Sequence, residues 1–270
     1  MKRIGYTSLA LLSVFTLAMA AGVANATPVP ITGVVTERIF NDCPLSTVTT
    51  VNNYPSSISI TDAWSDLCVG FANRHNWRFS TDGSSSAVFG NNNDFKYSAV
   101  MEIVGSGTCE AGLEVAPWWS PDAGGRIQAR IPDGEIACFD GRLPFYSFSN
   151  PAGHNLRYTG GKITMEIEYH ENGLSSGSPA TIEYRVVYNN VSYTSGPLPF
   201  DQANPAEDPP HGQWGMLDPA YVGGMAQTNN GTAGTGRTYV VNWEDISFTC
   251  FDCATSAQKS TWGRLKSLYR

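Results

Sequence analysis

The stretch Ile163-Thr164-Met165-Glu166-Ile167-Glu168-Tyr169-His170 alternates apolar and polar residues over its whole length. Successive side chains of a β-strand point to opposite faces of a sheet, so this order predicts a strand with one buried and one polar face. Residues 181–188 repeat the pattern, with apolar residues at every second position. The two segments are expected to pair as a hairpin, in which Glu166 and Glu168 face Glu183 and Arg185 as a cross-strand charge ladder.

The rest of the chain from Thr27 to about Cys253 carries the same kind of signal. Short β-branched and aromatic runs alternate with clusters of Gly, Asn, Ser and Pro, and no apolar stripe has the 3.6-residue period of a helix. The clearest expected strands are residues 97–104, 112–118, 126–131, 162–170, 181–188 and 238–248. Together they predict an all-β fold, a two-sheet antiparallel sandwich formed by one domain over residues 27–253.

The N-terminal residues 1–26 have the order of a cleaved secretory signal. Lys2-Arg3 precede an apolar run from Leu9 to Ala20, and small residues end the segment before Thr27. The run is shorter than the roughly 20 residues that a membrane-spanning helix needs. We therefore expect cleavage after Ala26 and a mature protein that is secreted, periplasmic or on the cell surface, and is not transmembrane.

Charge argues against one class of partner. Loss of Lys2 and Arg3 with the signal lowers the 17 basic residues to 15, against 24 acidic ones. Nucleic acid binding depends on basic side chains that neutralise phosphates, so we expect no nucleic acid partner.

The six cysteines all follow the signal segment, and an even number in an exported chain favours disulfides. They are Cys43, Cys68, Cys109, Cys138, Cys250 and Cys253. Order along the chain favours pairing the first with the second, the third with the fourth and the fifth with the sixth. We expect Cys250 and Cys253 to form a structural bridge, because no second CxxC completes a zinc site.

Residues 254–270 differ in composition from the predicted sandwich. A Ser/Thr/Ala-rich linker leads to an end in which Trp262, Leu265 and Leu268 are spaced three residues apart among basic residues. This spacing predicts a short basic amphipathic helix. We expect the tail to attach the protein to a surface-anchoring partner; the alternative is a disordered terminus.

The segment from Ala180 to Phe248 resembles the concanavalin-A-like and laminin-G-like jelly rolls. The resemblance rests on Ala180-Thr181-Ile182-Glu183-Tyr184, the Ser195–Phe200 and Tyr221–Gly224 segments, and the closing strand Val241–Phe248. Members of that superfamily include lectins, carbohydrate-binding modules, glycoside hydrolases and polysaccharide lyases. The resemblance therefore implies a jelly roll, with a polysaccharide or other glycan as partner.

Glu166-Ile167-Glu168-Tyr169-His170-Glu171 resembles the E-x-D-x-x-E strand motif of laminarinase-like glycoside hydrolases, with Glu168 where that family has Asp. The resemblance implies Glu166 as nucleophile, Glu168 as helper and Glu171 as acid/base. Glu171 is followed by Asn172-Gly173, which predicts a turn. The charge ladder is the interpretation that we favour.

Three tryptophans are the candidate glycan-binding residues. Trp118 and Trp119 end a predicted strand, where an aromatic face can stack on a sugar ring. Trp214 follows in a long loop, where it either binds a ligand or covers the core.

Other chemistries have weaker support. No histidine has a second ligand at a zinc spacing, so we expect no metal and no cofactor. Asp82-Gly83 and residues 91–94 could hold a structural calcium ion, although ordinary turns explain them as well. A lyase would need a Tyr or His beside an Arg or Asn, and Arg126, Arg130, Arg157 and Arg185 lie among the strands. Glycan binding, a hydrolase or lyase, and a non-catalytic envelope or matrix protein all remain open.

Overall fold

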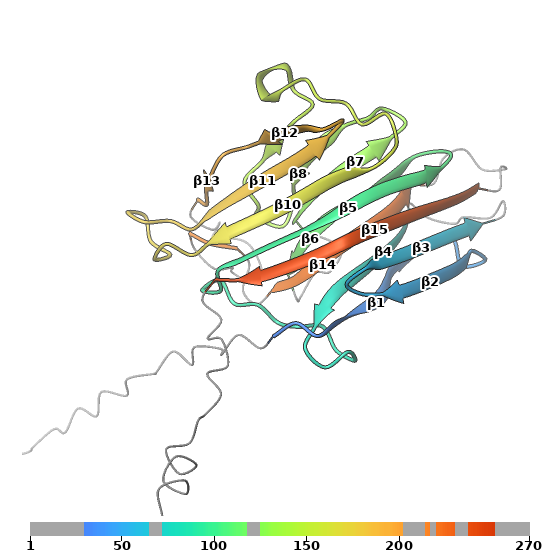
Figure 1. The fold of residues 1–270 in the computed structure, drawn as a ribbon, viewed down its shortest axis with the longest axis horizontal. Coiled ribbons are helices and arrows are strands. Elements are labelled where there is room, and N and C mark those ends of the chain that lie inside the picture. Colours follow the sequence, from blue (N-terminus) through green and yellow to red (C-terminus); the bar gives the residue numbers. More distant parts are fainter. Residues whose placement is uncertain are drawn as a thin grey trace, which may run out of the picture.

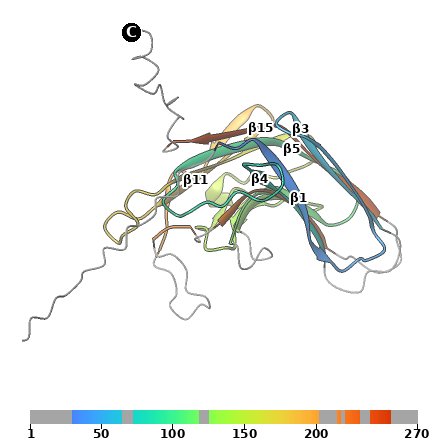
Figure 2. The same cartoon turned by 90° about the horizontal axis from the view of Figure 1, so that it is seen from below.

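A computed structural model describes residues 30–64, 72–117, 125–201, 214–216, 220–229 and 237–251. These residues form two antiparallel sheets, which are stacked as arched layers (Figures 1 and 2). Sheet A has the order β1 (Gly33–Asn41), β4 (Ala72–Ser80), β14 (Ala220–Asn229), β6 (Cys109–Pro117), β7 (Gly125–Ile131), β8 (Ile136–Phe139) and β9 (Tyr146–Ser147). Sheet B has the order β12 (Val191–Thr194), β11 (Thr181–Tyr188), β10 (Ile163–His170), β5 (Phe95–Gly105), β15 (Arg237–Cys250), β3 (Ser57–Trp64) and β2 (Thr47–Asn53), and β13 (Leu198–Pro199) pairs with β11.

The predicted all-β sandwich is confirmed. Each of the six expected strands is present, and residues 181–188 form β11 with the same bounds. Within the described ranges, one 3-10 turn, η1 (Pro151–Gly153), interrupts the strands. Among the residues described, no helix is long and apolar enough to cross a membrane.

The core lies between the sheets because each sheet turns one set of alternating side chains inward. In β10 the predicted apolar set is fully buried, whereas the alternate residues are only partly buried. Trp77 of sheet A and Trp243 of sheet B meet edge to face, with ring centroids 6.1 Å apart. Edge-to-face contact is a favoured geometry for buried aromatic rings, and here it joins the two layers.

One polar cluster lies inside this core. The side chain of Asp62 is fully buried, and its Oδ2 accepts hydrogen bonds from Asn73 at 2.8 Å and pairs with His75 Nε2 at 2.7 Å. Burial acts to raise the pKa of Asp62, but the contacts from His75 and Asn73 outweigh it, so the pKa lies below the ordinary Asp value.

The expected bridge between Cys109 and Cys138 is wrong, because both are buried free thiols. Cys109 lies opposite Ile131, and Cys138 lies opposite Ile127, so β7 separates the two cysteines and they are offset by four positions. Strand spacing and rise place their Cα atoms roughly 16 Å apart, well beyond the ~7 Å limit for a disulfide.

The other described cysteines differ from this pair. Cys43 and Cys250 are disulfide-bonded. The predicted partners, Cys68 and Cys253, lie outside the described residues, as do the signal segment and the tail. Those pairings stay predictions.

Candidate functional site

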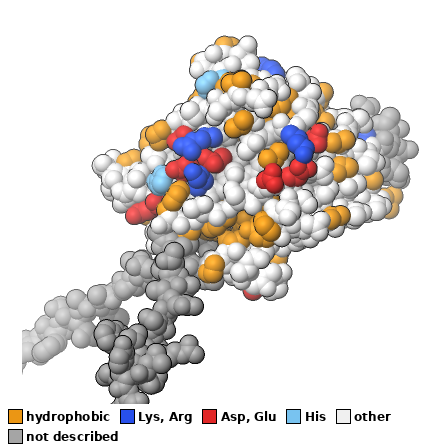
Figure 3. Space-filling view, in the orientation of Figure 1, with side chains coloured by type: hydrophobic (Ala, Val, Ile, Leu, Met, Phe, Trp, Pro, Cys, Tyr) orange, Lys and Arg blue, Asp and Glu red, His pale blue; other side chains and the backbone are white. Residues whose placement is uncertain are grey.

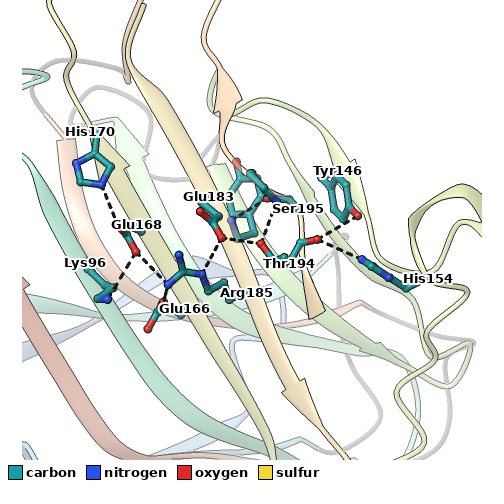
Figure 4. A network of polar contacts seen from close by, with 12 residues as sticks. Lys96, Tyr146, His154, Glu166, Glu168, His170, Glu183, Arg185, Thr194 and Ser195 are labelled. Carbon is teal, nitrogen blue, oxygen red and sulfur yellow. Dashed lines mark hydrogen bonds and ion pairs between the residues drawn. The ribbon is translucent and has the colours of Figure 1, made fainter. Parts of the chain in front are cut away.

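The carboxylates expected from the strand motif lie on the outer face of sheet B. Glu166 is directly opposite Arg185, and Glu168 is opposite Glu183. Arg185 contacts all three carboxylates, with distances of 2.9 Å to Glu166, 3.1 Å to Glu168 and 2.7 Å to Glu183 (Figure 4). The predicted cross-strand ladder is confirmed as a set of contacts. In Figure 3 it forms one of two clusters of charge on this face.

Glu168 has further partners. His170 Nε2 lies 2.9 Å from its Oε1, and Lys96 lies 3.6 Å from its Oε2. Burial acts to raise the pKa of Glu168, but the His170 hydrogen bond and the charges of Lys96 and Arg185 outweigh it and lower the pKa. The pKa of His170 is raised, because its contacts with Glu168 and Asp94 outweigh burial. Glu168 is thus held as an anion among cations.

Glu171, the third residue of the motif, lies just after β10. Its backbone N–H donates to Asp94 Oδ1 at 2.6 Å, and its carbonyl accepts from Leu174 at 3.1 Å. The predicted turn is confirmed, so Glu171 does not share the strand on which Glu166 and Glu168 lie.

Of the candidate tryptophans, Trp118 and Trp119 lie outside the described residues. Trp214 is half-buried and has a left-handed backbone, with φ of 62°. Its N–H donates to Asp201, and its carbonyl accepts from Ala180 at 2.8 Å. Trp214 is therefore tied to the start of β11.

A second polar surface, which the sequence did not single out as a site, covers the outer face of sheet A. Core residues Trp77 and Phe79 point toward sheet B, so the alternate residues of β4 point away from it. The same alternation in β14, β6 and β7 completes one set of outward polar residues. We call it the arginine face: Arg74, Asn76, Arg78, Glu110, Glu114, Arg126, Gln128, Arg130 and Gln227.

Strand register arranges these residues in rows across sheet A. One row joins Arg78, Gly223, Glu114 and Arg126. The next joins Asn76, Met225, Gly112 and Gln128, and a third joins Arg74, Gln227, Glu110 and Arg130. All nine polar residues except Arg130 are at most 7% exposed, although sheet B lies on the opposite side.

Two positions in the rows of the arginine face are occupied by glycine, Gly112 and Gly223. A Cβ at Gly112 would lie 1.9 Å from the Ile127 carbonyl oxygen, and one at Gly223 would lie 2.0 Å from the Trp77 carbonyl oxygen. Both oxygens belong to neighbouring strands and cannot move aside cheaply. Both positions therefore require glycine, and neither contributes a side chain to the arginine face.

Glu114 organises one half of the arginine face. Its carboxylate pairs with Arg74 and accepts a hydrogen bond from Asn76 Nδ2 at 2.7 Å. Both members of the ion pair are at most 2% exposed. A buried pair of this kind fixes geometry, because removal of either partner leaves a charge in a poorly solvated place.

Arg126 organises the other half. It donates to Gln128 Oε1 at 2.7 Å and pairs with Asp140 at 2.6 Å, and its guanidinium lies over the Phe139 ring. Glu110 lies 3.8 Å from Arg126 and 3.9 Å from Arg130. The pKa of Arg130 is raised, chiefly by its hydrogen bond to Asp133.

Two side chains on this face have donors to spare. Arg78 pairs with Glu37 at 2.8 Å and lies over the Tyr221 ring at 4.6 Å, yet its Nε and Nη2 have no hydrogen-bond partner among the described residues. Nε2 of Gln128 likewise has none within that part of the chain. A buried donor without a partner costs about 1–3 kcal/mol, so a ligand that accepts these hydrogen bonds recovers that cost.

The arrangement favours binding over hydrolysis. Glu110 and Glu114 are four residues apart on one strand, so their Cα atoms are roughly 13 Å apart. Arginines of the face contact both carboxylates. Of the described residues on this face, Tyr221 is the one phenol, and none is a histidine. Amide and guanidinium donors dominate it.

The loops considered for calcium have their oxygens engaged locally. Asp82 accepts hydrogen bonds from Ser84 and Ser85, which lower its pKa, and Asn93 Oδ1 accepts from Gly90 at 2.8 Å. Within the described ranges, no group of three or more His, Cys, Asp or Glu side chains is arranged to hold a metal ion.

Comparison with known proteins gives distant structural likenesses. No protein-family model and no curated protein matches the chain. A functionally unknown protein from Saccharomyces cerevisiae is similar at 14% identity and a TM-score of 0.39, covering 77% of this chain and 98% of its own. The alginate lyase from Corynebacterium sp. is similar at 8% identity and a TM-score of 0.40, covering 78% and 83%. A glycoside hydrolase family 16 endo-glucanase from Bacteroides ovatus is similar at 10% identity and a TM-score of 0.37, covering 80% and 94%.

Proposed function

We propose that this protein is an exported carbohydrate-binding domain whose ligand, an acidic polysaccharide, lies on the arginine face. The proposal rests on the unpaired donors of the arginine face. Its polar side chains are nearly buried although the opposite sheet does not contact them, and donors of Arg78 and Gln128 lack partners in the described structure. Carbohydrates offer many hydrogen-bond acceptors, and a carboxylate on the polymer would add a charge-assisted bond.

The support for an acidic ligand comes from one arginine and not from a surplus of positive charge. Each of the four arginines on the face has a carboxylate partner: Arg74 pairs with Glu114, Arg78 with Glu37, Arg126 with Asp140 and Arg130 with Asp133. Glu114 is engaged by Arg74 and Asn76. Arg78 faces Glu37 with one Nη only, which leaves Nε and Nη2 for a ligand. Guanidinium groups bind carboxylates with two parallel hydrogen bonds, which suits a polymer of uronate residues.

Location outside the cell is part of the proposal. It is supported by the signal-like residues 1–26 and by the disulfide-bonded state of Cys43 and Cys250. Attachment through the basic tail, residues 254–270, is also proposed.

The test is a binding screen of the secreted protein against uronate polymers and neutral glucans, followed by titration calorimetry. Gln128→Glu keeps the acceptor for Arg126, removes the unpaired donor and adds a negative charge. We expect it to weaken binding of the acidic polymer roughly 10- to 100-fold, as loss of one such hydrogen bond implies. Thr164→Glu adds the same charge on the outer face of sheet B and should leave binding unchanged. Equal loss in both variants, or binding of neutral glucan alone, would refute the proposal.

A lyase is the second candidate, favoured by the Tyr221 ring beneath the Arg78 guanidinium at 4.6 Å. Elimination in a uronate polymer needs a base and a cation that neutralises the carboxylate, and this pair offers both groups. Release of unsaturated uronate, followed by ultraviolet absorbance, tests it. Activity that is abolished by Tyr221→Phe would establish the lyase, and absence of the product with every polymer that binds would exclude it.

The hydrolase alternative would use Glu166, Glu168 and Glu171. Arg185 contacts the first two and the third lies beyond the strand end, so this triad has less support than the arginine face. Glu166→Gln and Glu168→Gln should leave glycan binding intact.

A further inference from the structure

A cavity of about 170 Å³ lies at the open edge of the sandwich, between edge strand β1 of sheet A and edge strand β2 of sheet B. It is lined by Thr36, Glu37, Arg38, Val48, Thr50, Ile60 and His75. We propose that this cavity is a second binding site, which takes one ring-sized carboxylate such as a single uronic acid. The site is separate from the arginine face, because its walls are side chains that point between the sheets.

Strand register builds the walls. Arg38 is directly opposite His75 within sheet A, and Thr50 is directly opposite Ile60 within sheet B. Asn52 of β2 donates to the Val34 carbonyl of β1 at 3.1 Å, which joins the two edges on one side of the cavity. The edges are therefore held at a fixed separation rather than left to open and close freely.

On the other side of the cavity, Arg38 is held in place by hydrogen bonds and provides the positive charge that would bind a carboxylate. Its Nη2 donates to the Cys43 carbonyl at 3.1 Å and to Ser46 Oγ at 2.7 Å. Its Nε is buried and has no hydrogen-bond partner in the described part of the chain. A guanidinium that is already oriented loses little entropy when it binds, so an incoming carboxylate gains most of the charge-assisted hydrogen bond.

The neighbouring charges do not oppose an anion. Glu37 contributes to the lining, but its carboxylate binds Arg78 at 2.8 Å on the outer face of β1, because adjacent strand residues point opposite ways. Asp62 does not line the cavity; its carboxylate is fully buried and pairs with His75 Nε2 at 2.7 Å. Arg38 is thus the arginine of the cavity wall, and its Nε is a donor without a partner in the described part of the chain.

Size and lining limit the ligand class. A protein cavity of about 150 Å³ accommodates benzene, so this cavity has room for the atoms of one six-membered ring, and the substituents of a sugar ring would extend toward the open edge of the sandwich. Val48 and Ile60 offer apolar contact to ring carbons, and the hydroxyls of Thr36 and Thr50 can pair with ring hydroxyls. A ring with hydroxyls and one carboxylate matches all three features.

The test uses the full secreted chain, with glucuronate and glucose as probes in ligand-observed NMR and calorimetry. We expect glucuronate to bind at least 10-fold more tightly than glucose. Thr50→Phe should fill the cavity and abolish glucuronate binding. Thr49→Phe is the matched control, since Thr49 is also exposed on the same strand but points to the outer face of sheet B. Arg38→Gln should remove the preference for glucuronate over glucose.

Three results would overturn the proposal: no glucuronate binding to the wild-type chain, equal affinity for glucose, or wild-type binding in Thr50→Phe. Circular dichroism and melting temperature of Thr50→Phe and Thr49→Phe must match, and Thr50 is exposed enough that both variants should fold. Gln128→Glu should leave this site unchanged, so failure here and failure of the polysaccharide proposal give different results.

Discussion

Glu114→Gln should destabilise this protein far more than its small chemical change suggests. The carboxylate of Glu114 is 2% exposed, pairs with Arg74 and accepts from Asn76. Glutamine keeps the shape but removes the charge, so the Arg74 guanidinium, 1% exposed, loses its ion-pair partner. Breaking a buried pair in this way costs about 3–5 kcal/mol. For a domain of this size each kcal/mol lowers the melting temperature by about 2–4 °C, which gives a drop of roughly 6–20 °C.

The measurement is thermal unfolding followed by circular dichroism, with Glu166→Gln as control. Glu166 also pairs with an arginine on a strand, at 2.9 Å, but the two side chains are 21% and 37% exposed. Exposed pairs contribute about 0–1 kcal/mol, so this control should lower the melting temperature by no more than about 4 °C. Adding Arg74→Met to Glu114→Gln should restore part of the loss, because the buried guanidinium is then removed together with the carboxylate that it pairs with. Equal drops in the two Glu→Gln variants would refute the reasoning.

Three further predictions concern the fold. The pKa of Asp62 is lowered in the folded protein, so Asp62 stabilises the fold above the unfolded Asp pKa of about 3.9, and this contribution is lost as the pH falls through the lower folded value. Asp62→Asn should therefore reduce the fall in melting temperature that acid causes. The same fall in the variant as in the wild type would contradict this. The thiols of Cys109 and Cys138 should react with a thiol reagent only after unfolding, because burial raises both pKa values; reaction in the native state would show that they are accessible. Gly112→Ala should destabilise the chain strongly, because its Cβ would lie 1.9 Å from a carbonyl oxygen. Gly177→Ala is the control, since a Cβ there meets nothing within 4 Å. Similar melting temperatures of the two variants would show that position 112 does not require glycine.

The strands of sheet B were readable from sequence because one of their faces is solvated. In β10 and β11 every second residue is buried and the residues between them are partly buried or exposed, so period-2 patterning alone gave the strands and their facing pairs. β4 gave no such signal: all nine of its residues are buried, with polar side chains such as Asn73 and His75 on the inner face as well. A strand that is polar on both faces has the composition of a loop.

The candidate site was missed for the same reason. Arg126 and Arg130 were noticed as arginines among strands. Their alternation with Ile127 and Ala129 shows that they share a face of β7, but the register with β6 is needed to show that this is the outer face that carries Glu110 and Glu114. Register between strands far apart in sequence depends on the whole sheet, and a local pattern does not contain it. The cysteine pairing failed likewise, because order along the chain ignores the intervening strand β7.

The position of the last two strands bears on when this chain can fold. β14 lies between β4 and β6 in sheet A, and β15 lies between β5 and β3 in sheet B (Figure 1). Until residues 220–250 have left the ribosome, each sheet consists of two halves with no strand to join them. Contacts of such long sequence separation also slow folding, since distant segments must meet before any of them is stabilised. The two sheets can therefore be completed only after residues 220–250 have been synthesised, and until then the chain lacks the closed sandwich that would prevent its being threaded through a narrow channel.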